Sequence, residues 1–314
     1  MKKLKFLIIL MLISMLNISV VHASSAISSL DATDRVLFIS SYNASFDTLP
    51  SQIEGIKSVF DGASVALDID YMDTKTHNYD ENYNNYYDFL KTRLENGAPY
   101  DVVIVGDDNA LQFIMDNRNE LFPSTPIVFF CINDMTRAKT ANAMKDMTGI
   151  VESISLRTNI DLSINLFPDT KKLTAIVDNT NTGLGDANAF MAIASNYPDL
   201  TFTLLNTSDY TYDDLANTLN QLEKDTVLFY LSMFEDKTGH HMTIKESARY
   251  IALNTKVPTI RMSIGGVGDG LLGGNMVSYD EQGRLAATMA LSILRGTDPD
   301  SIEMIKNSPK QPFL

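Results

Sequence analysis

The stretch DVVIVGDDNA, residues 101–110, contains the features that decide the fold. Its four consecutive Val and Ile residues, 102–105, are typical of a short strand that is buried on both faces of a sheet. A glycine and two aspartates then supply turn-forming residues, and a pattern of helical period begins at Asn109. A buried strand that leads through a polar turn into a helix is the repeating unit of a parallel sheet.

The same unit recurs along most of the chain. We expect strands at the short apolar runs 36–41, 66–72, 102–105, 127–131, 173–177, 202–205, 227–231 and 259–262. We expect helices at the segments of helical period 50–60, 79–95, 109–120, 156–166, 183–196, 212–222 and 243–254. This alternation predicts an α/β fold with parallel strands.

Two breaks in the alternation predict two lobes. Residues 148–151 follow a polar, alanine-rich stretch and are expected to open a second set of strand–helix units, and the glycine-rich segment 265–274 precedes a return to the first set. Each lobe is expected to be a doubly wound parallel sheet, with hinges near 147–149 and 274–278. The expected division is lobe 1 at 34–147 and 275–296, lobe 2 at 148–274, and a crossing segment at 297–314 that stops short, as in a fragment of a longer chain.

The net charge excludes one class of partner. The chain has 25 Lys and Arg against 39 Asp and Glu, which gives a formal charge of −14 at pH 7. Because nucleic-acid binding needs clustered Lys and Arg, we expect no nucleic-acid partner. The single cysteine, Cys131, lies in an apolar run, so the chain has no internal disulfide and no cysteine-based zinc site.

The first 23 residues have the pattern of an export signal. A basic start, 1–5, precedes the apolar stretch 6–21 and the small-x-small sequence Val21-His22-Ala23. The apolar stretch falls just short of the ~20 residues that span a bilayer, so two alternatives stay open: cleavage as a signal peptide or retention as an anchor. A lipoprotein anchor is excluded because no cysteine follows the cleavage point. We expect the remaining chain to be extracytoplasmic.

The residues that follow the predicted strands are the candidate ligand-binding residues. Ligands of parallel sheets bind beyond the carboxyl ends of the strands, near helix N-termini. The candidates are Ser41, Tyr42, Asn43, Asp107, Asp108, Asn109, Asn133, Asp178, Asn179, Thr180, Ser232 and Phe234. The same residue types cap helices and form turns, so each polar candidate also has a structural interpretation.

The chemistry of these strand ends favours a ligand that carries an amine. Carboxylates are frequent there and cations are few. A ligand carboxylate would use helix N-terminal N–H groups near Asn109 or Gly183, and Tyr42 or Phe234 would cover an apolar portion. An amino acid or a small amine-bearing compound is therefore expected.

Catalytic and metal motifs do not fit the sequence. Asp107 and Asp108 are adjacent, so their side chains point to different sides and are unsuited to act as an acid–base pair. His240 and His241 lack the surrounding pattern of a zinc site, and the glycine-rich segment 265–270 lacks the Lys and Ser or Thr of a phosphate-binding loop. We interpret that segment as a loop between the lobes. We expect neither enzymatic activity nor a cofactor.

A series of short motifs resembles one known family. In the first half they are VLFISSY (36–42), YMDTK (71–75), DVVIVGDDNA (101–110), ELFP (120–123) and PIVF (126–129). In the second half they are TGIVE (148–152), FPDT (167–170), GLLGG (270–274) and QG (282–283). In order and spacing, over about 35–296, they resemble the ABC-transporter substrate-binding family related to tryptophan-binding proteins. The resemblance is greatest to members fused as extracytoplasmic sensors to histidine kinases and diguanylate cyclases.

This resemblance implies a type I periplasmic-binding-protein fold, in which two lobes joined by a hinge close on a small molecule without catalysis. Two functions of the ligand-binding protein stay open. One is the input domain of a membrane-bound kinase or cyclase, with a second membrane span after residue 314. The other is a diffusible protein that delivers ligand to an ABC permease. The family often has aromatic or acidic residues where this chain has Arg261, Met262 and Ser263, so the ligand's identity stays open.

Overall fold

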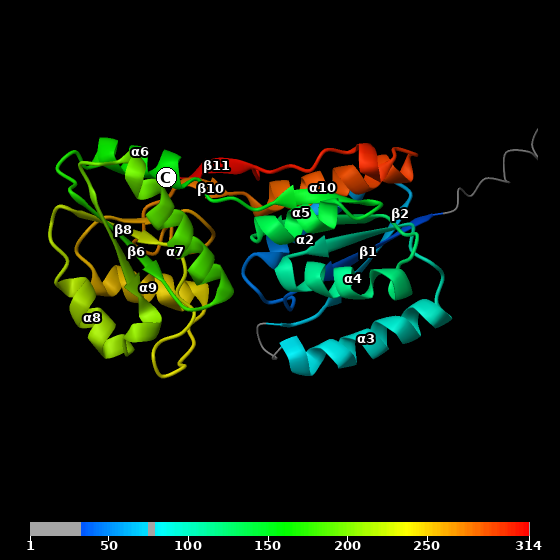
Figure 1. The fold of residues 1–314 in the computed structure, drawn as a ribbon, viewed down its shortest axis with the longest axis horizontal. Helices are drawn as coiled ribbons and strands as arrows, with labels where there is room; N and C mark the ends of the chain where they lie inside the picture. The colour runs from blue at the N-terminus through cyan, green and yellow to red at the C-terminus, as the bar shows by residue number, and fades with distance from the viewer. Residues whose placement is uncertain (1–32, 75–78, 314) are drawn as a thin grey trace, which may run out of the picture.

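The computed structural model describes residues 33–74 and 79–313, and the predicted export signal at 1–23 lies outside these ranges. The predicted α/β architecture is confirmed. Two lobes lie side by side, each built on a sheet of parallel strands (Figure 1). Among the helices in the described ranges, none is both long and apolar enough to cross a membrane.

Lobe 1 contains a five-stranded sheet in the order β2-β1-β3-β4-β5. Its strands are β1 (Asp34–Ser40), β2 (Val65–Tyr71), β3 (Val102–Gly106), β4 (Ile127–Ile132) and β5 (Met147–Val151). Its helices are α2 (Leu49–Phe60), α3 (Tyr79–Asn96), α4 (Asp108–Leu121), α5 (Met135–Asn142) and α10 (Tyr279–Leu294). The chain direction across the sheet reverses between β1 and β3, which is where ligands bind in doubly wound sheets.

The apolar run of β3 is buried on both faces, as its sequence predicts. Val102 and Ile104 pack with residues of α2 and α10, whereas Val103 and Val105 pack with residues of α3 and α4. Alternate side chains of a strand point to opposite faces, so a strand covered by helices on both sides must be apolar throughout.

Lobe 2 repeats this architecture with a four-stranded sheet in the order β7-β6-β8-β9. Its strands are β6 (Lys172–Val177), β7 (Thr201–Asn206), β8 (Thr226–Tyr230) and β9 (Thr259–Arg261). Its helices are α6 (Leu156–Leu166), α7 (Asn181–Ile193), α8 (Tyr212–Asn220) and α9 (Ile244–Asn254). Helices α6 and α7 cover one face of the sheet, and α8 and α9 cover the other.

The expectation that residues 148–151 open lobe 2 is wrong. They belong to β5, whose residues are all buried and which pairs with β4 in the first sheet. Helix α5, which precedes β5, was not predicted because it is short and polar. Its N-cap is Asp134, whose carboxylate accepts hydrogen bonds from the backbone N–H groups of Thr136 and Arg137.

The expected hinge at 147–149 is also wrong. Gly149 is packed within β5, where an added Cβ would lie 2.0 Å from the Phe129 carbonyl oxygen. The chain leaves lobe 1 only after Glu152, whose N–H still bonds to the Ile132 carbonyl. The glycine-rich segment 265–274 is likewise not a loop between the lobes, because its glycines contact α9 and Leu272 bonds to β9.

Segments near 152–155, 275–278 and 305–310 cross between the lobes along the upper side of Figure 1. Strand β10 (Gly274–Val277) pairs antiparallel with β11 (Lys310–Phe313). Side-chain hydrogen bonds also join the crossings, such as that from Ser153 N–H to Ser308 Oγ at 3.1 Å. The three segments therefore support one another at the junction where a hinge motion must take place.

Candidate ligand-binding site between the lobes

The carboxyl ends of the strands in one lobe face those in the other. A direct contact joins them, because the hydroxyl of Ser263, after β9, lies 2.8 Å from that of Tyr279 at the start of α10. Charges also act across the gap, from Asp186 on α7 to Glu152 after β5. The strand ends of the two lobes therefore lie opposite each other, and a shared ligand site there stays a prediction.

Three predicted residues of lobe 1 are engaged in local structure. Ser41 Oγ accepts a hydrogen bond from the backbone N–H of Ala110 at 2.8 Å and donates one to the Gly106 carbonyl at 2.9 Å. Ser41 thus holds the start of α4 against β1. Asn43 and Asn109 use their amides to bind neighbouring side chains, Asp73 at 2.7 Å and Thr74 at 2.8 Å respectively. These bonds fit the structural interpretation of those residue types.

The two adjacent aspartates differ in their surroundings. Asp107 is buried and has a φ of 70°, a left-handed conformation that is costly for a residue with a Cβ. Asp108 accepts hydrogen bonds from the N–H groups of Asn133 and Asp134, at 3.0 and 3.2 Å, and pairs with Arg137 at 3.0 Å. Asp108 therefore fixes the turn that leads from β4 into α5.

We expect Asp108→Ala to lower the free energy of unfolding by about 2 kcal/mol, because it removes a charged acceptor from two backbone N–H groups. Ligand affinity should change less than twofold, because the Asp108 oxygens are already engaged. Urea denaturation and titration calorimetry on the same preparation measure both quantities. An unchanged stability with a large loss of affinity would instead place Asp108 on the ligand.

Three predicted residues of lobe 2 are also engaged in local hydrogen bonds. Asp178 is almost fully buried and accepts hydrogen bonds from the N–H groups of Thr180 at 3.1 Å and Phe234 at 2.8 Å. Thr180 caps α7 through the N–H of Gly183, and Asn179 Oδ1 accepts a hydrogen bond from the side-chain amide of Asn206 at 2.8 Å. These contacts hold the carboxyl ends of β6 and β8 together.

Sequence reasoning missed Glu152, which follows β5. Its carboxylate accepts a hydrogen bond from the Tyr279 hydroxyl at 3.2 Å and one from the Gln282 amide at 3.4 Å. Both donors lie on the first turns of α10. The available signal was the position of Glu152 directly after an apolar run, but that run was assigned to the wrong lobe.

Burial controls the electrostatics of two carboxyl groups in this site. The pKa of Glu152 is raised to about 7, chiefly by burial; Asp186 and Asp108 add to the increase, and the two hydrogen bonds just described oppose it. Burial also raises the pKa of Asp186 to about 7, although Arg261 lowers it. Burial, together with Asp107, Asp108 and Glu152, holds the pKa of the Tyr42 hydroxyl well above its usual range.

Arg261 is a buried cation of lobe 2 that sequence reasoning did not include among the site residues. Its Nη1 donates to the carbonyls of Tyr230 at 3.0 Å and Leu231 at 2.9 Å, and its Nε donates to that of Ile264 at 3.1 Å. The guanidinium lies 4.0 Å from the centre of the Tyr230 ring. Arg261 thus ties the ends of β8 and β9 together and adds positive potential near Asp186.

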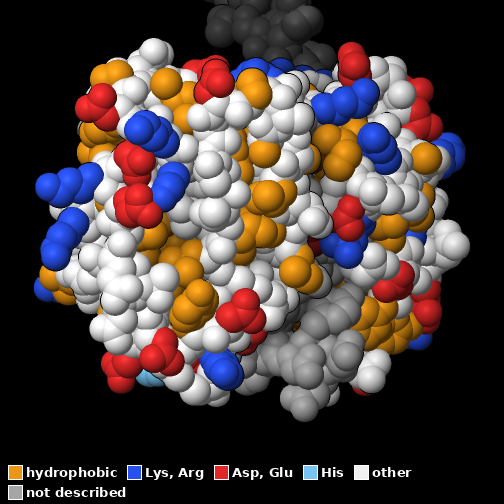
Figure 2. Space-filling view, turned by 60° about the vertical axis from the view of Figure 1, so that its left-hand side comes forward, with side chains coloured by type: hydrophobic (Ala, Val, Ile, Leu, Met, Phe, Trp, Pro, Cys, Tyr) orange, Lys and Arg blue, Asp and Glu red, His pale blue; other side chains and the backbone are white. Residues whose placement is uncertain are grey.

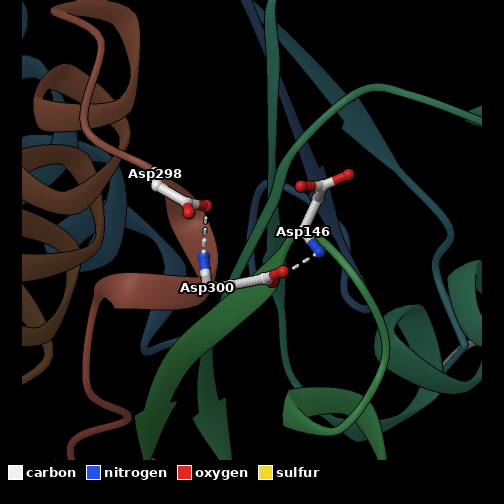
Figure 3. Close-up of side chains that lie close together, drawn as sticks. All are labelled: Asp146, Asp298 and Asp300. Carbon is white, nitrogen blue, oxygen red and sulfur yellow. Dashed lines mark hydrogen bonds between the residues drawn. The ribbon is translucent and has the colours of Figure 1, made fainter.

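A separate acidic cluster, Asp146, Asp298 and Asp300, lies at the opposite ends of the strands (Figure 3). Asp300 accepts a hydrogen bond from the N–H of Asp146 at 2.8 Å, and Asp298 accepts one from the N–H of Asp300 at 3.1 Å. The Asp298 and Asp300 carboxylates thus satisfy backbone N–H groups in turns. On the face that Figure 2 shows, acidic and basic side chains are interspersed.

The sequence and the fold were compared with known proteins. A family model described as ABC transporter substrate binding protein matches residues 45–314. The chain belongs to this substrate-binding family. The predicted family resemblance is therefore confirmed, whereas a fusion to a kinase or cyclase is not shown. A search of curated protein sequences found no match.

Solved structures share the fold of this family member at low sequence identity. A conserved domain protein from Vibrio cholerae has a TM-score of 0.65 and 13% identity, covering 89% of this chain and 91% of that one. The ligand-free, open form of a Clostridium difficile substrate-binding protein has a TM-score of 0.63 and 15% identity, covering 88% and 89%. An ABC domain from Streptococcus pneumonia in complex with L-Trp has a TM-score of 0.63 and 14% identity, covering 89% and 90%.

Proposed function

We propose that this chain binds a small amine-bearing molecule, such as an amino acid, between its lobes and closes on it without catalysis. The observation that carries the proposal is the surplus of hydrogen-bond acceptors where the strand ends of the two lobes face each other. Membership of a substrate-binding family and the likeness to a domain that holds L-Trp support it.

We assign the predicted site residues two kinds of role in this proposal. Direct contact with the ligand falls to Tyr42, Asp107, Asn133, Ser232 and Phe234, which follow β1, β3, β4 and β8 at the strand ends that face the other lobe. The engaged residues hold the strand ends in place behind the ligand: Ser41, Asn43, Asp108, Asn109, Asp178, Asn179 and Thr180.

We further propose that the chain acts outside the cytoplasm, with two candidate outputs. Family membership supports delivery of the ligand to an ABC permease. The motif resemblance to sensor domains supports the input domain of a membrane-bound histidine kinase or diguanylate cyclase. The genome distinguishes them, because a permease gene beside this one favours delivery and a reading frame that continues into a kinase or cyclase favours sensing.

Ligand binding is expected to stabilise the protein and to compact it. A ligand at 100 times its Kd should raise the free energy of unfolding by about 2.7 kcal/mol, because it binds only the folded state. A thermal-shift screen of the amino acids and of small amines measures this stabilisation. Small-angle scattering on a compound that binds should then show a smaller radius of gyration.

Two results would contradict different parts of the proposal. If no compound of the screen raised the melting temperature, binding of amine-bearing small molecules would be wrong. If a compound bound tightly but left the radius of gyration unchanged, binding would stand and closure of the lobes would be wrong, because a hinge motion must change the overall dimensions.

A further inference from the structure

Each lobe contributes one carboxyl group that is poorly solvated where the lobes meet. Glu152 comes from the crossing segment after β5 in lobe 1, and Asp186 comes from the second turn of α7 in lobe 2. The two carboxylates act on each other across the gap, since the charge of Asp186 disfavours ionisation of Glu152. Like charges that face each other in a poorly solvated gap need a counter-charge.

Each of these carboxyls has a buried oxygen beside it that lacks a hydrogen-bond partner. Gln282 is fully buried, and its Oε1 accepts no hydrogen bond while its Nε2 binds Glu152. Ser232 is 2% exposed. Its Oγ lies beside Asp186 but makes no hydrogen bond of normal geometry. A buried oxygen without a partner costs free energy, which a ligand donor would recover.

The nearby cations of the protein supply only part of this counter-charge, since the pKa of Asp186 stays raised although Arg261 lowers it. Arg261 donates to three backbone carbonyls, as described above, and Arg137 pairs with Asp108. Lys310 donates to Ser153 Oγ at 3.1 Å and to the Ser308 carbonyl at 2.9 Å, at the junction of the crossing segments. The hydrogen bonds that these side chains donate therefore go to groups of the protein itself.

We propose that Glu152 and Asp186 bind one cationic nitrogen of the ligand from opposite lobes, with Gln282 Oε1 and Ser232 Oγ as the neutral acceptors available to its third N–H. This inference rests on the proposed function and names the part of the ligand that is recognised. An ammonium group offers a positive charge and three donors, one for each carboxylate and one for a neutral acceptor. The cation then draws the lobes together, because it relieves the repulsion between the two carboxylates.

The inference predicts that the amine, rather than the carboxylate, is the part of an amino acid that binding requires. We would compare sets of three compounds that share a side chain: L-phenylalanine, phenethylamine and 3-phenylpropanoate, and L-leucine, isoamylamine and 4-methylpentanoate. For every set that contains a binder, the two amine-bearing compounds should bind at least 100-fold more tightly than the deaminated acid. Titration calorimetry at pH 8 measures each affinity.

Two single variants test the assigned residues. Glu152→Gln and Asp186→Asn should each weaken binding of the amines at least tenfold, because each removes one of the two negative charges. Both variants should remain folded, since an amide resembles the neutral carboxylic acid in shape. The matched control is Glu223→Gln, which changes an exposed carboxylate paired with Lys172 at the opposite ends of the strands and should leave affinity unchanged.

The pH dependence gives a second measurement. Affinity of the wild type for an amine should fall as the pH is lowered from 8 to 5.5, because protons then compete with the cation, and each variant should show a weaker dependence. The titratable or charged groups that face the two carboxyls are Tyr42, Asp108, Cys131, Tyr279 and Lys310 around Glu152, and Asp178 and Arg261 around Asp186.

The outcomes separate this inference from the proposed function. Equal affinity for deaminated acids and amines would overturn the binding of one nitrogen by both carboxylates, and so would wild-type affinity in both variants. Either result would leave ligand binding itself intact. If no compound of any set bound the wild type, the proposed function would fail and this inference would fail with it.

Discussion

Replacing Gly55 by alanine is expected to lower the free energy of unfolding by at least about 3 kcal/mol. Gly55 lies in the middle of α2, where an added Cβ would lie 1.9 Å from the Asp280 carbonyl oxygen and 2.8 Å from the Arg284 nitrogen of α10. The same helix pair is in backbone contact at Gly283, where a Cβ would lie 2.3 Å from the Gln52 carbonyl oxygen. The new methyl group must therefore push two helices apart.

The matched control is Gly185→Ala in α7. Gly185 also lies inside a helix, but an added Cβ there meets no atom within 4 Å. Alanine should therefore raise stability at this position by about 1 kcal/mol, because of its higher helix propensity. Chemical denaturation of the two variants measures the contrast. If Gly55→Ala were as stable as the wild type, the close approach of α2 and α10 would be wrong.

The contact between α2 and α10 also bears on the binding site. Tyr279 and Gln282, which hold the Glu152 carboxylate, lie on the first turns of α10 close to its contact with Gly55. A shift of α10 would move both donors. We therefore expect any folded fraction of Gly55→Ala to bind ligand more weakly than the wild type.

The stability of the ligand-free protein is expected to fall as the pH rises from about 4.5 to about 7. The pKa values of Glu152 and Asp186 are both raised to about 7, from ordinary values of 4.5 and 3.8. The folded state thus binds these protons more tightly than the unfolded state does, and the advantage is lost as the pH rises through the folded pKa. Each carboxyl should lower the free energy of unfolding by about 3 kcal/mol over this range.

The double variant Glu152→Gln, Asp186→Asn isolates this effect. Its free energy of unfolding should stay nearly flat over the same range, because an amide does not titrate. Carboxyls whose pKa is lowered, such as Asp68 and Glu281, act in the opposite direction, but their contribution changes below about pH 4.5. Urea denaturation at half-unit pH intervals measures both proteins. Parallel curves for wild type and variant would rule out the assignment to these two carboxyls.

Much of the fold follows from local patterns in the sequence. The apolar runs and helical periods predicted eight of the strands in the two sheets, as in β3, where a continuous apolar run matches burial on both faces. Helix α5 escaped this reasoning because it is short and lacks a strong apolar face. The polar residues that follow the strands could also be predicted from the sequence, because they come directly after the apolar runs.

The partners of those polar side chains depend on long-range contacts. Ser41 could line a site or cap a helix, and only the hydrogen bond to Ala110, which lies 69 positions away, shows that it caps α4. The same holds for Asp108, whose bonds reach the turn after β4. A residue type that serves equally well in turns and in sites does not reveal its role without its neighbours.

The sequence by itself thus determined the alternation of strands and helices and the family, because both are carried by the order of residues along the chain. Only the tertiary structure decided which lobe β5 joins, because a short apolar strand fits either sheet until its hydrogen bonds to β4 are known. That pairing places Glu152 beside Tyr279 and opposite Asp186, residues that are 127 and 34 positions away. Burial by these distant segments, which no local pattern encodes, gives the two carboxyls their raised pKa values.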